Sequence, residues 1–172
     1  MKKMLCSMMV LLLLSCSAIK VSYDYDNEVD FSNYTTYNYY PEMQTGLSEL
    51  DTKRLLDAVD AEMQAKGIKL TAEPEFFINI ESSSFQKPRN NTVGVGLGGG
   101  GRNVGGGVSV GIPVGRPNMG RQIRFDFVDN QKDQLFWQAI SQSTFKENLS
   151  PVERDEKLQA LVTKVFAKYP PE

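Results

Sequence analysis

Alternating apolar and polar residues predict several β-strands after residue 19. Residues 20–26 place Val21, Tyr23 and Tyr25 on one face and polar residues on the other, which indicates a half-buried strand. Residues 34–40 are rich in tyrosine and threonine and predict a second strand. Residues 76–80 place three apolar side chains on one face, and residues 123–127 do the same. We therefore expect a sheet with one face directed toward a core.

Two other segments carry apolar residues at helical spacing. The first begins after Ser48 or Asp51, either of which can cap a helix, and continues until Gly67. The second opens with the capping box Ser150 to Glu153, with proline at the first helical position. Its apolar stripe consists of Leu158, Leu161, Val162, Val165, Phe166 and Tyr169. A stripe of this kind is more often part of a core than a groove for a partner.

Glycine dominates one part of the chain, where 11 of the 14 glycines fall between Gly94 and Gly115. Apolar residues alternate with glycine on both sides of the centre GGGGRNVGGG, so we predict a hairpin over residues 92–116 whose strands each have one bare face. A flexible glycine linker is the alternative, because glycine loses entropy on folding. After this segment, residues 123–127 and 135–145 flank a polar turn and predict an antiparallel hairpin that carries Trp137.

These elements together predict an α+β fold. We expect a mostly antiparallel β-sheet of about six strands, with the two helices packed on one face. The length and apolar content favour one α+β domain over residues 20–172.

The first sixteen residues have the pattern of an export signal. Lys2 and Lys3 precede an apolar run over residues 4–14, which is too short to span a membrane and typical of a secretory signal peptide. The run ends in Leu13-Leu14-Ser15-Cys16, which resembles the bacterial lipobox. We expect cleavage between Ser15 and Cys16, removal of residues 1–15, and acylation of Cys16, including palmitate. Residues 16–19 would then form a short lipidated tether.

An ordinary buried or disulfide-bonded thiol at Cys16 is the alternative. Its only candidate partner is Cys6, which would be removed with the signal peptide.

Composition removes several classes of function. The full chain has a net charge of −2, and loss of two lysines with the signal makes it −4, so nothing favours binding to nucleic acid. The chain has no histidine, which excludes histidine-dependent triads and the commonest metal ligand. We expect no catalytic residues, no cofactor and no metal site.

Two catalytic motifs match by letter only. The sequence Gly94-x-Gly96-x-x-Gly99 has the dinucleotide-binding spacing, but no helix can begin in this glycine run. The sequence around Ser109 matches the nucleophile elbow, but no histidine is present to accept the serine proton. An acidic run over residues 24–30 starts like a calcium loop but has Val29 where that loop needs glycine. We interpret the run as a solvated strand end and turn.

Several segments resemble a known family. They are VDFSNYTTYNYY at residues 29–40, AKG at 65–67, PEFFINI at 74–80, the glycine hairpin, RQIRFDFVDNQKDQLFWQA at 121–139 and SPVERDEKLQALVTKVFAKYPP at 150–171. Together they are similar to bacterial envelope lipoproteins of domain-of-unknown-function family 4136. The resemblance covers nearly the whole chain after the signal. It implies a location and an architecture, and it assigns no catalytic or binding residues.

The sequence therefore predicts a non-enzymatic cell-envelope lipoprotein that acts as a structural or protein-interaction module. Its N-terminal acyl chains would hold it in the membrane, and its partner would be another envelope protein. The alternative is periplasmic binding of a small or lipidic ligand between sheet and helices. Ser17 is not the aspartate that retains many lipoproteins in the inner membrane, so we expect the periplasmic side of the outer membrane of a Gram-negative cell. Inner-membrane anchoring stays open.

Overall fold

The computed structural model describes residues 19–86, 92–94, 111–113, 119–144 and 148–171. The helices are α2 (Glu49–Ala65) and α3 (Pro151–Phe166), with a short 3₁₀ turn, η2, at Phe31–Asn33. The strands are β1 (Lys20–Tyr25), β2 (Thr36–Tyr39), β3 (Lys69–Leu70), β4 (Phe76–Gln86), β5 (Thr92–Gly94), β6 (Gly111–Pro113), β7 (Met119–Asp129) and β8 (Leu135–Thr144).

Six strands form one sheet in the order β1-β8-β7-β4-β2-β3. The pairs β1–β8, β8–β7 and β7–β4 are antiparallel, whereas β2 runs parallel to both β4 and β3. The predicted α+β class and the six-stranded sheet are confirmed. The sheet is mixed, and not purely antiparallel, because α2 carries the chain back to the end of the sheet where β2 began.

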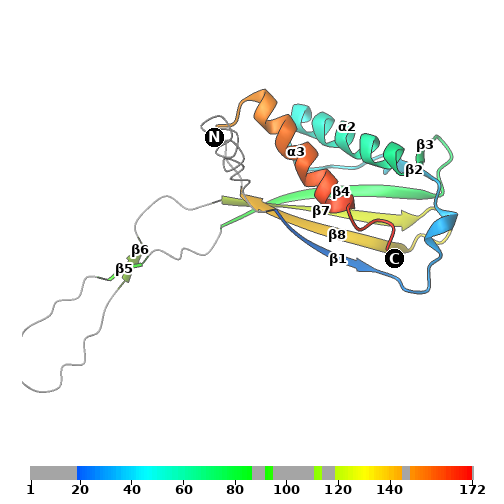
Figure 1. Cartoon of the computed structure of the whole chain (residues 1–172), viewed down its shortest axis with the longest axis horizontal. Coiled ribbons are helices and arrows are strands. Elements are labelled where there is room, and N and C mark those ends of the chain that lie inside the picture. Colours follow the sequence, from blue (N-terminus) through cyan, green and yellow to red (C-terminus); the bar gives the residue numbers. More distant parts are fainter. Residues whose placement is uncertain (1–18, 87–91, 95–110, 114–118, 145–147, 172) are drawn as a thin grey trace, which may run out of the picture.

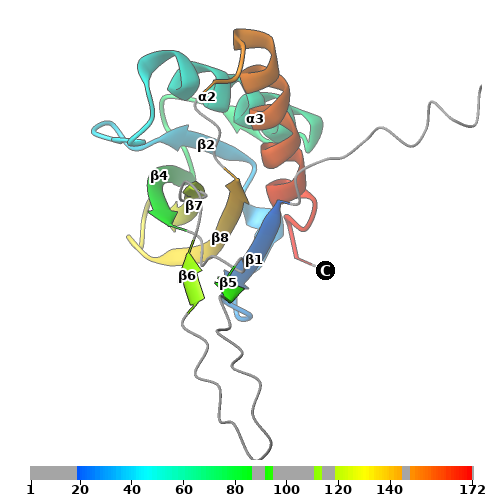
Figure 2. The same ribbon diagram turned by 90° about the vertical axis from the view of Figure 1, so that its left-hand side faces the viewer.

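Both helices begin at the same end of the sheet and lie on the same side of it (Figures 1 and 2). Two contacts show that the helices run parallel to each other. Near their first turns Asp51 of α2 pairs with Arg154 of α3, and farther along both helices Glu62 accepts a hydrogen bond from Thr163. Lys20 lies in register with Gln142 at this end of the sheet. We call it the N-terminal end of the sheet, since the described chain enters there.

The core lies between the helices and the sheet. Alternate residues of β4, β7 and β8 are buried, including Phe76, Phe127 and Trp137. The α3 stripe supplies the opposing surface, and Phe166 lies fully buried against Phe127 and Trp137, with ring centroids 5.8 Å and 5.7 Å apart. The apolar side chains that recur along the strands and along α3 thus pack together in one layer.

Local signals act at the helix ends as the sequence predicts. Ser48, one of the two candidate caps, accepts a hydrogen bond from the Asp51 amide at the start of α2. The capping box of α3 is present between Ser150 and Glu153. Gly67 follows α2 with a φ of +79°, a conformation that glycine adopts without steric cost.

The predicted glycine hairpin over residues 92–116 lies mostly outside the described residues. Its described parts, β5 and β6, pair antiparallel with each other in a separate two-stranded sheet. The glycine-rich centre and Ser109 fall outside the described residues, so the predictions about them stay predictions.

Candidate functional site

The predicted lipidation site, Cys16, and the cleavage residue Ser15 both lie outside the described residues. The described chain begins three residues later with Ile19, which is buried, and β1 starts at Lys20. Three residues of extended chain span at most about 11 Å. An acyl group on Cys16 would therefore hold the N-terminal end of the sheet close to a membrane surface.

The interior between sheet and helices is filled by aromatic rings. Phe127 lies 4.6 Å from Trp137 and 4.9 Å from Tyr169, measured between ring centroids. The Trp137 indole nitrogen and the Tyr169 hydroxyl are buried without a hydrogen-bond partner among the described residues. This part of the core therefore has little room for a ligand.

A small cavity of about 40 Å³ lies where the two helices begin above the ends of β7 and β8. Its polar lining includes Asp51, Arg121 and Arg154. The Asp51 carboxylate is buried and pairs with Arg54 and Arg154, each at 2.9 Å. Burial lowers the pKa of Arg121 from its usual value. The cavity is large enough for a few water molecules, so the cluster fastens α2 to α3 and does not enclose an organic ligand.

A tyrosine–carboxylate cluster joins β2 to α2. The hydroxyls of Tyr37 and Tyr39 both donate to Asp60 Oδ1, each at 2.6 Å. Burial, and then the hydrogen bond to Asp60, raise the pKa values of both tyrosines well above the usual value. Both phenols stay protonated at physiological pH, so the cluster is a hydrogen-bonded link between β2 and α2.

This cluster borders a surface groove of about 380 Å³ lined by Tyr37, Asp60, Gln64, Gly67, Ile68, Lys69 and Leu70. The groove lies between the C-terminal part of α2 and the short edge strand β3, and its lining combines the buried Tyr37 and Ile68 with the exposed Leu70.

A second buried pair ties the turn after β7 to the start of β2. Tyr34 donates from its hydroxyl to Asp129 Oδ2 at 2.7 Å, and the Gln131 and Lys132 amides donate to Asp129 Oδ1. Burial acts to raise the pKa of Asp129, but these hydrogen bonds outweigh it and hold the pKa below its usual value. Asp129 thus stays ionised and fixes the turn.

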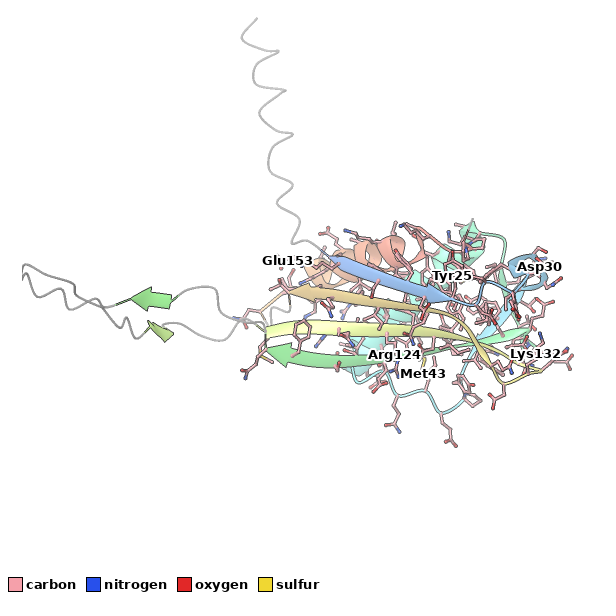
Figure 3. The ribbon with its side chains drawn as sticks, turned by 90° about the horizontal axis from the view of Figure 1, so that it is seen from below. Tyr25, Asp30, Met43, Arg124, Lys132 and Glu153 are labelled. Carbon is pink, nitrogen blue, oxygen red and sulfur yellow. The ribbon has the colours of Figure 1, made fainter. Side chains whose placement is uncertain are left out.

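The face of the sheet away from the helices is polar and open (Figure 3). Arg124 pairs with Glu81 at 2.6 Å and with Asp126 at 3.0 Å, and Gln138 donates to Asp126. A shallow groove of about 360 Å³ crosses β4, β7 and β8 on this face, and its lining includes Met43, Val128 and Leu135. Exposed ion pairs of this kind contribute little to stability.

The acidic run over residues 24–30 is used in turns. Asp26 accepts a hydrogen bond from the Glu28 amide, and Asp30 accepts from the amide and hydroxyl of Ser32. Within the described residues, no group of three or more metal-ligating acidic, histidine or cysteine side chains occurs. Among those residues there is also no helix long and apolar enough to cross a membrane.

The sequence did not indicate the contacts that join distant elements. Tyr34 meets Asp129 across 95 residues, and Asp51 meets Arg154 across 103. No local pattern marks these pairs, because each residue is also common on a solvated surface.

The fold and these contacts define an α+β domain with a filled core and an open sheet face. The sequence matches the family described as "Domain of unknown function (DUF4136)" over residues 21–171, so the chain belongs to that family. No functionally curated protein matches the chain.

Solved structures share the fold. The chain is similar to a PDZ domain protein from Parabacteroides distasonis, with 15% identity and a TM-score of 0.59. The match covers 99% of this chain and 41% of the other, so this chain spans about two fifths of that protein's length. It is also similar to the PelC dodecamer from Paraburkholderia phytofirmans, with 8% identity and a TM-score of 0.50, over 87% of this chain and 96% of that one. At such identities the likeness concerns the fold alone.

Proposed function

We propose that this chain is a non-enzymatic lipoprotein of the bacterial cell envelope that serves as a structural or protein-interaction module. Signal peptidase would cleave between Ser15 and Cys16, and acyl chains on Cys16 would anchor the domain. The proposed location is the periplasmic side of the outer membrane.

The filled core is the observation that carries the interaction role. A ligand held between sheet and helices needs a cavity of several hundred Å³. Among the described residues, the cavity beneath the starts of the two helices measures about 40 Å³, and hollows of about 360 Å³ and 380 Å³ lie on the sheet face away from the helices and between α2 and β3. A domain built this way offers its outer faces to a partner more readily than its interior to a ligand.

The short N-terminal tether supports anchoring. Only residues 17 and 18 separate Cys16 from the buried Ile19, so the domain would stay at the membrane surface. The open sheet face and the sheet edge would then be presented at a fixed height. PelC, which shares the fold, is a dodecamer, and assembly between copies is one form that such an interaction can take.

The test of anchoring is a comparison of wild type with Cys16→Ser in a Gram-negative host. We expect wild-type protein in the outer-membrane fraction, with an intact mass that shows loss of residues 1–15 and addition of acyl chains. Cys16→Ser should lose the acyl mass and leave the membrane fraction. Cys6→Ser is the matched control, because a cysteine inside the signal should not affect the mature mass.

Wild-type protein that retains residues 1–15, or that carries no acyl group, would contradict the proposal. The interaction role is tested separately, by cross-linking in intact cells. Equal cross-linked products from wild type and from a variant with altered outer-face charges, such as Arg124→Glu, would argue against use of the open face.

A further inference from the structure

The two edges of the six-stranded sheet are not equivalent. One edge ends in β3, which has only two residues. Beside it, the segment after β2 covers the outer edge of β4: the Tyr40 amide donates to the Ile78 carbonyl, and the Ser82 amide donates to the Thr45 carbonyl at 2.7 Å. This edge is therefore short or covered along its length.

The opposite edge is β1, which presents six residues in a continuous strand (Figure 3). Its inner side pairs with β8 along its whole length. Among the described residues, no backbone hydrogen bond reaches its outer side between Lys20 and Tyr25. A strand of this length with an open edge is a template for another strand.

The side chains of β1 are incompletely covered. Val21 and Tyr23 lie on the core side of the sheet, opposite Ser141 and Ala139 of β8, yet both are only half-buried. Tyr25 follows on the same side and is 40% exposed. A further strand beside β1 would cover the exposed flanks of these residues.

The sequence of β1 is complementary to itself in one antiparallel register. Directly opposed residues of two paired strands have their side chains on the same side of the sheet. The helices of both copies therefore lie on one side only in registers that pair even-numbered residues with even-numbered ones and odd with odd. With Ser22 opposite the same residue of a second chain, Lys20 meets Asp24 twice and Val21 meets Tyr23 twice. Opposite charges and apolar pairs then face each other, and like charges do not meet.

We propose that a second copy of this chain pairs with β1 edge to edge in this register. The dimer would have a twofold axis through the Ser22 pair, perpendicular to the sheet, and would close after two copies. The two Lys20 residues would lie about 13 Å apart along the strand direction, given about 3.3 Å per residue. The two chains would enter on opposite sides of the axis, and the short distance between the entry points would allow both tethers to reach one membrane.

The proposal rests on the sheet edge and not on the anchor. The contact is small, so association should be weak in solution and stronger when both copies share a surface. Failure of acylation at Cys16 would leave the strand pairing untouched, and failure of the pairing would leave the anchoring untouched.

The test uses single cysteine substitutions in the full chain, purified in detergent and exposed to a mild oxidant. Directly opposed strand residues have Cα atoms about 4.5–5.5 Å apart, within the range for a disulfide. Ser22→Cys should therefore form a disulfide dimer readily. Lys20→Cys and the exposed β4 residue in Ser84→Cys are controls that should stay at the wild-type background, since neither position meets its own copy.

Charge exchange gives an independent check. Lys20→Asp and Asp24→Lys should each weaken dimerisation roughly fivefold, because two like-charged pairs then replace two attractive ones. The double variant should recover wild-type affinity in analytical ultracentrifugation. Cross-linking of Ser22→Cys no greater than that of the controls, or a double variant as weak as the singles, would overturn the proposal.

Discussion

Gly46 lies at the point where the segment after β2 crosses the edge of β4. Its φ is +70°, a conformation that costs a residue with a side chain about 1–2 kcal/mol. A Cβ atom at this position would lie 2.8 Å from the Ser82 carbonyl oxygen, which belongs to the backbone of β4 and cannot turn aside. Gly46→Ala must therefore move either the segment or the strand.

Gly67 provides the matched comparison. It has a similar φ of +79°, but a Cβ atom there would meet nothing within 4 Å. Gly67→Ala should cost only the conformational term, about 1–2 kcal/mol of unfolding free energy. Gly46→Ala adds a steric term of about 1–3 kcal/mol, so the total should reach about 2–5 kcal/mol.

Trp137 makes the measurement direct. It is the only tryptophan and is 1% exposed, so its fluorescence reports unfolding of the core. Urea titrations of wild type and both variants should give similar m-values and midpoints in the order wild type, Gly67→Ala, Gly46→Ala. Equal losses for the two variants, to within about 0.5 kcal/mol, would refute the steric argument.

Two further predictions concern the core and acid stability. Phe166→Ala should lower the unfolding free energy by about 3–5 kcal/mol, because loss of its fully buried ring leaves a cavity. The control Val152→Ala, at a 66% exposed position, should change the unfolding free energy by less than about 0.5 kcal/mol. Similar losses for the two variants would place the α3 stripe outside the core. The folded-state pKa of Asp129 lies below its unfolded value of about 3.9, so its contribution is complete above that pH and is lost as the pH falls through the folded pKa. Asp129→Asn should therefore flatten the pH dependence of stability below about pH 4, as followed by urea midpoints, and an unchanged slope would show that other carboxylates cause the acid loss.

The membrane anchor is the part of the candidate function that depends on sequence alone. A charged start, an apolar run and a cysteine after Ser15 are read by processing enzymes in an extended chain, so they need no tertiary structure. The prediction at Cys16 lies outside the described residues and stays a prediction. The family match is likewise a property of the sequence, and it covers residues 21–171.

Local patterns also determined most of the elements. The alternation in β1, the Ser150 capping box and the stripe of α3 each depend on residues within a few positions of one another, and the structure has all three. The β7–β8 hairpin follows for the same reason, since its turn and both arms are adjacent in the chain. Each of these features depends on side-chain periodicity or on backbone hydrogen bonds within a short segment, so distant parts of the chain do not alter the pattern.

The tertiary structure decided how the elements meet. The polar second half of β4, around Ser82, carries no strand signal and becomes a strand because β7 pairs with it along its whole length. The parallel position of β2 beside β4, the two-residue β3, and the Asp51–Arg154 pair join parts that lie far apart in the chain. Such contacts gain energy only after long loops have closed, so they reflect the whole packed arrangement and leave no pattern in the neighbouring residues.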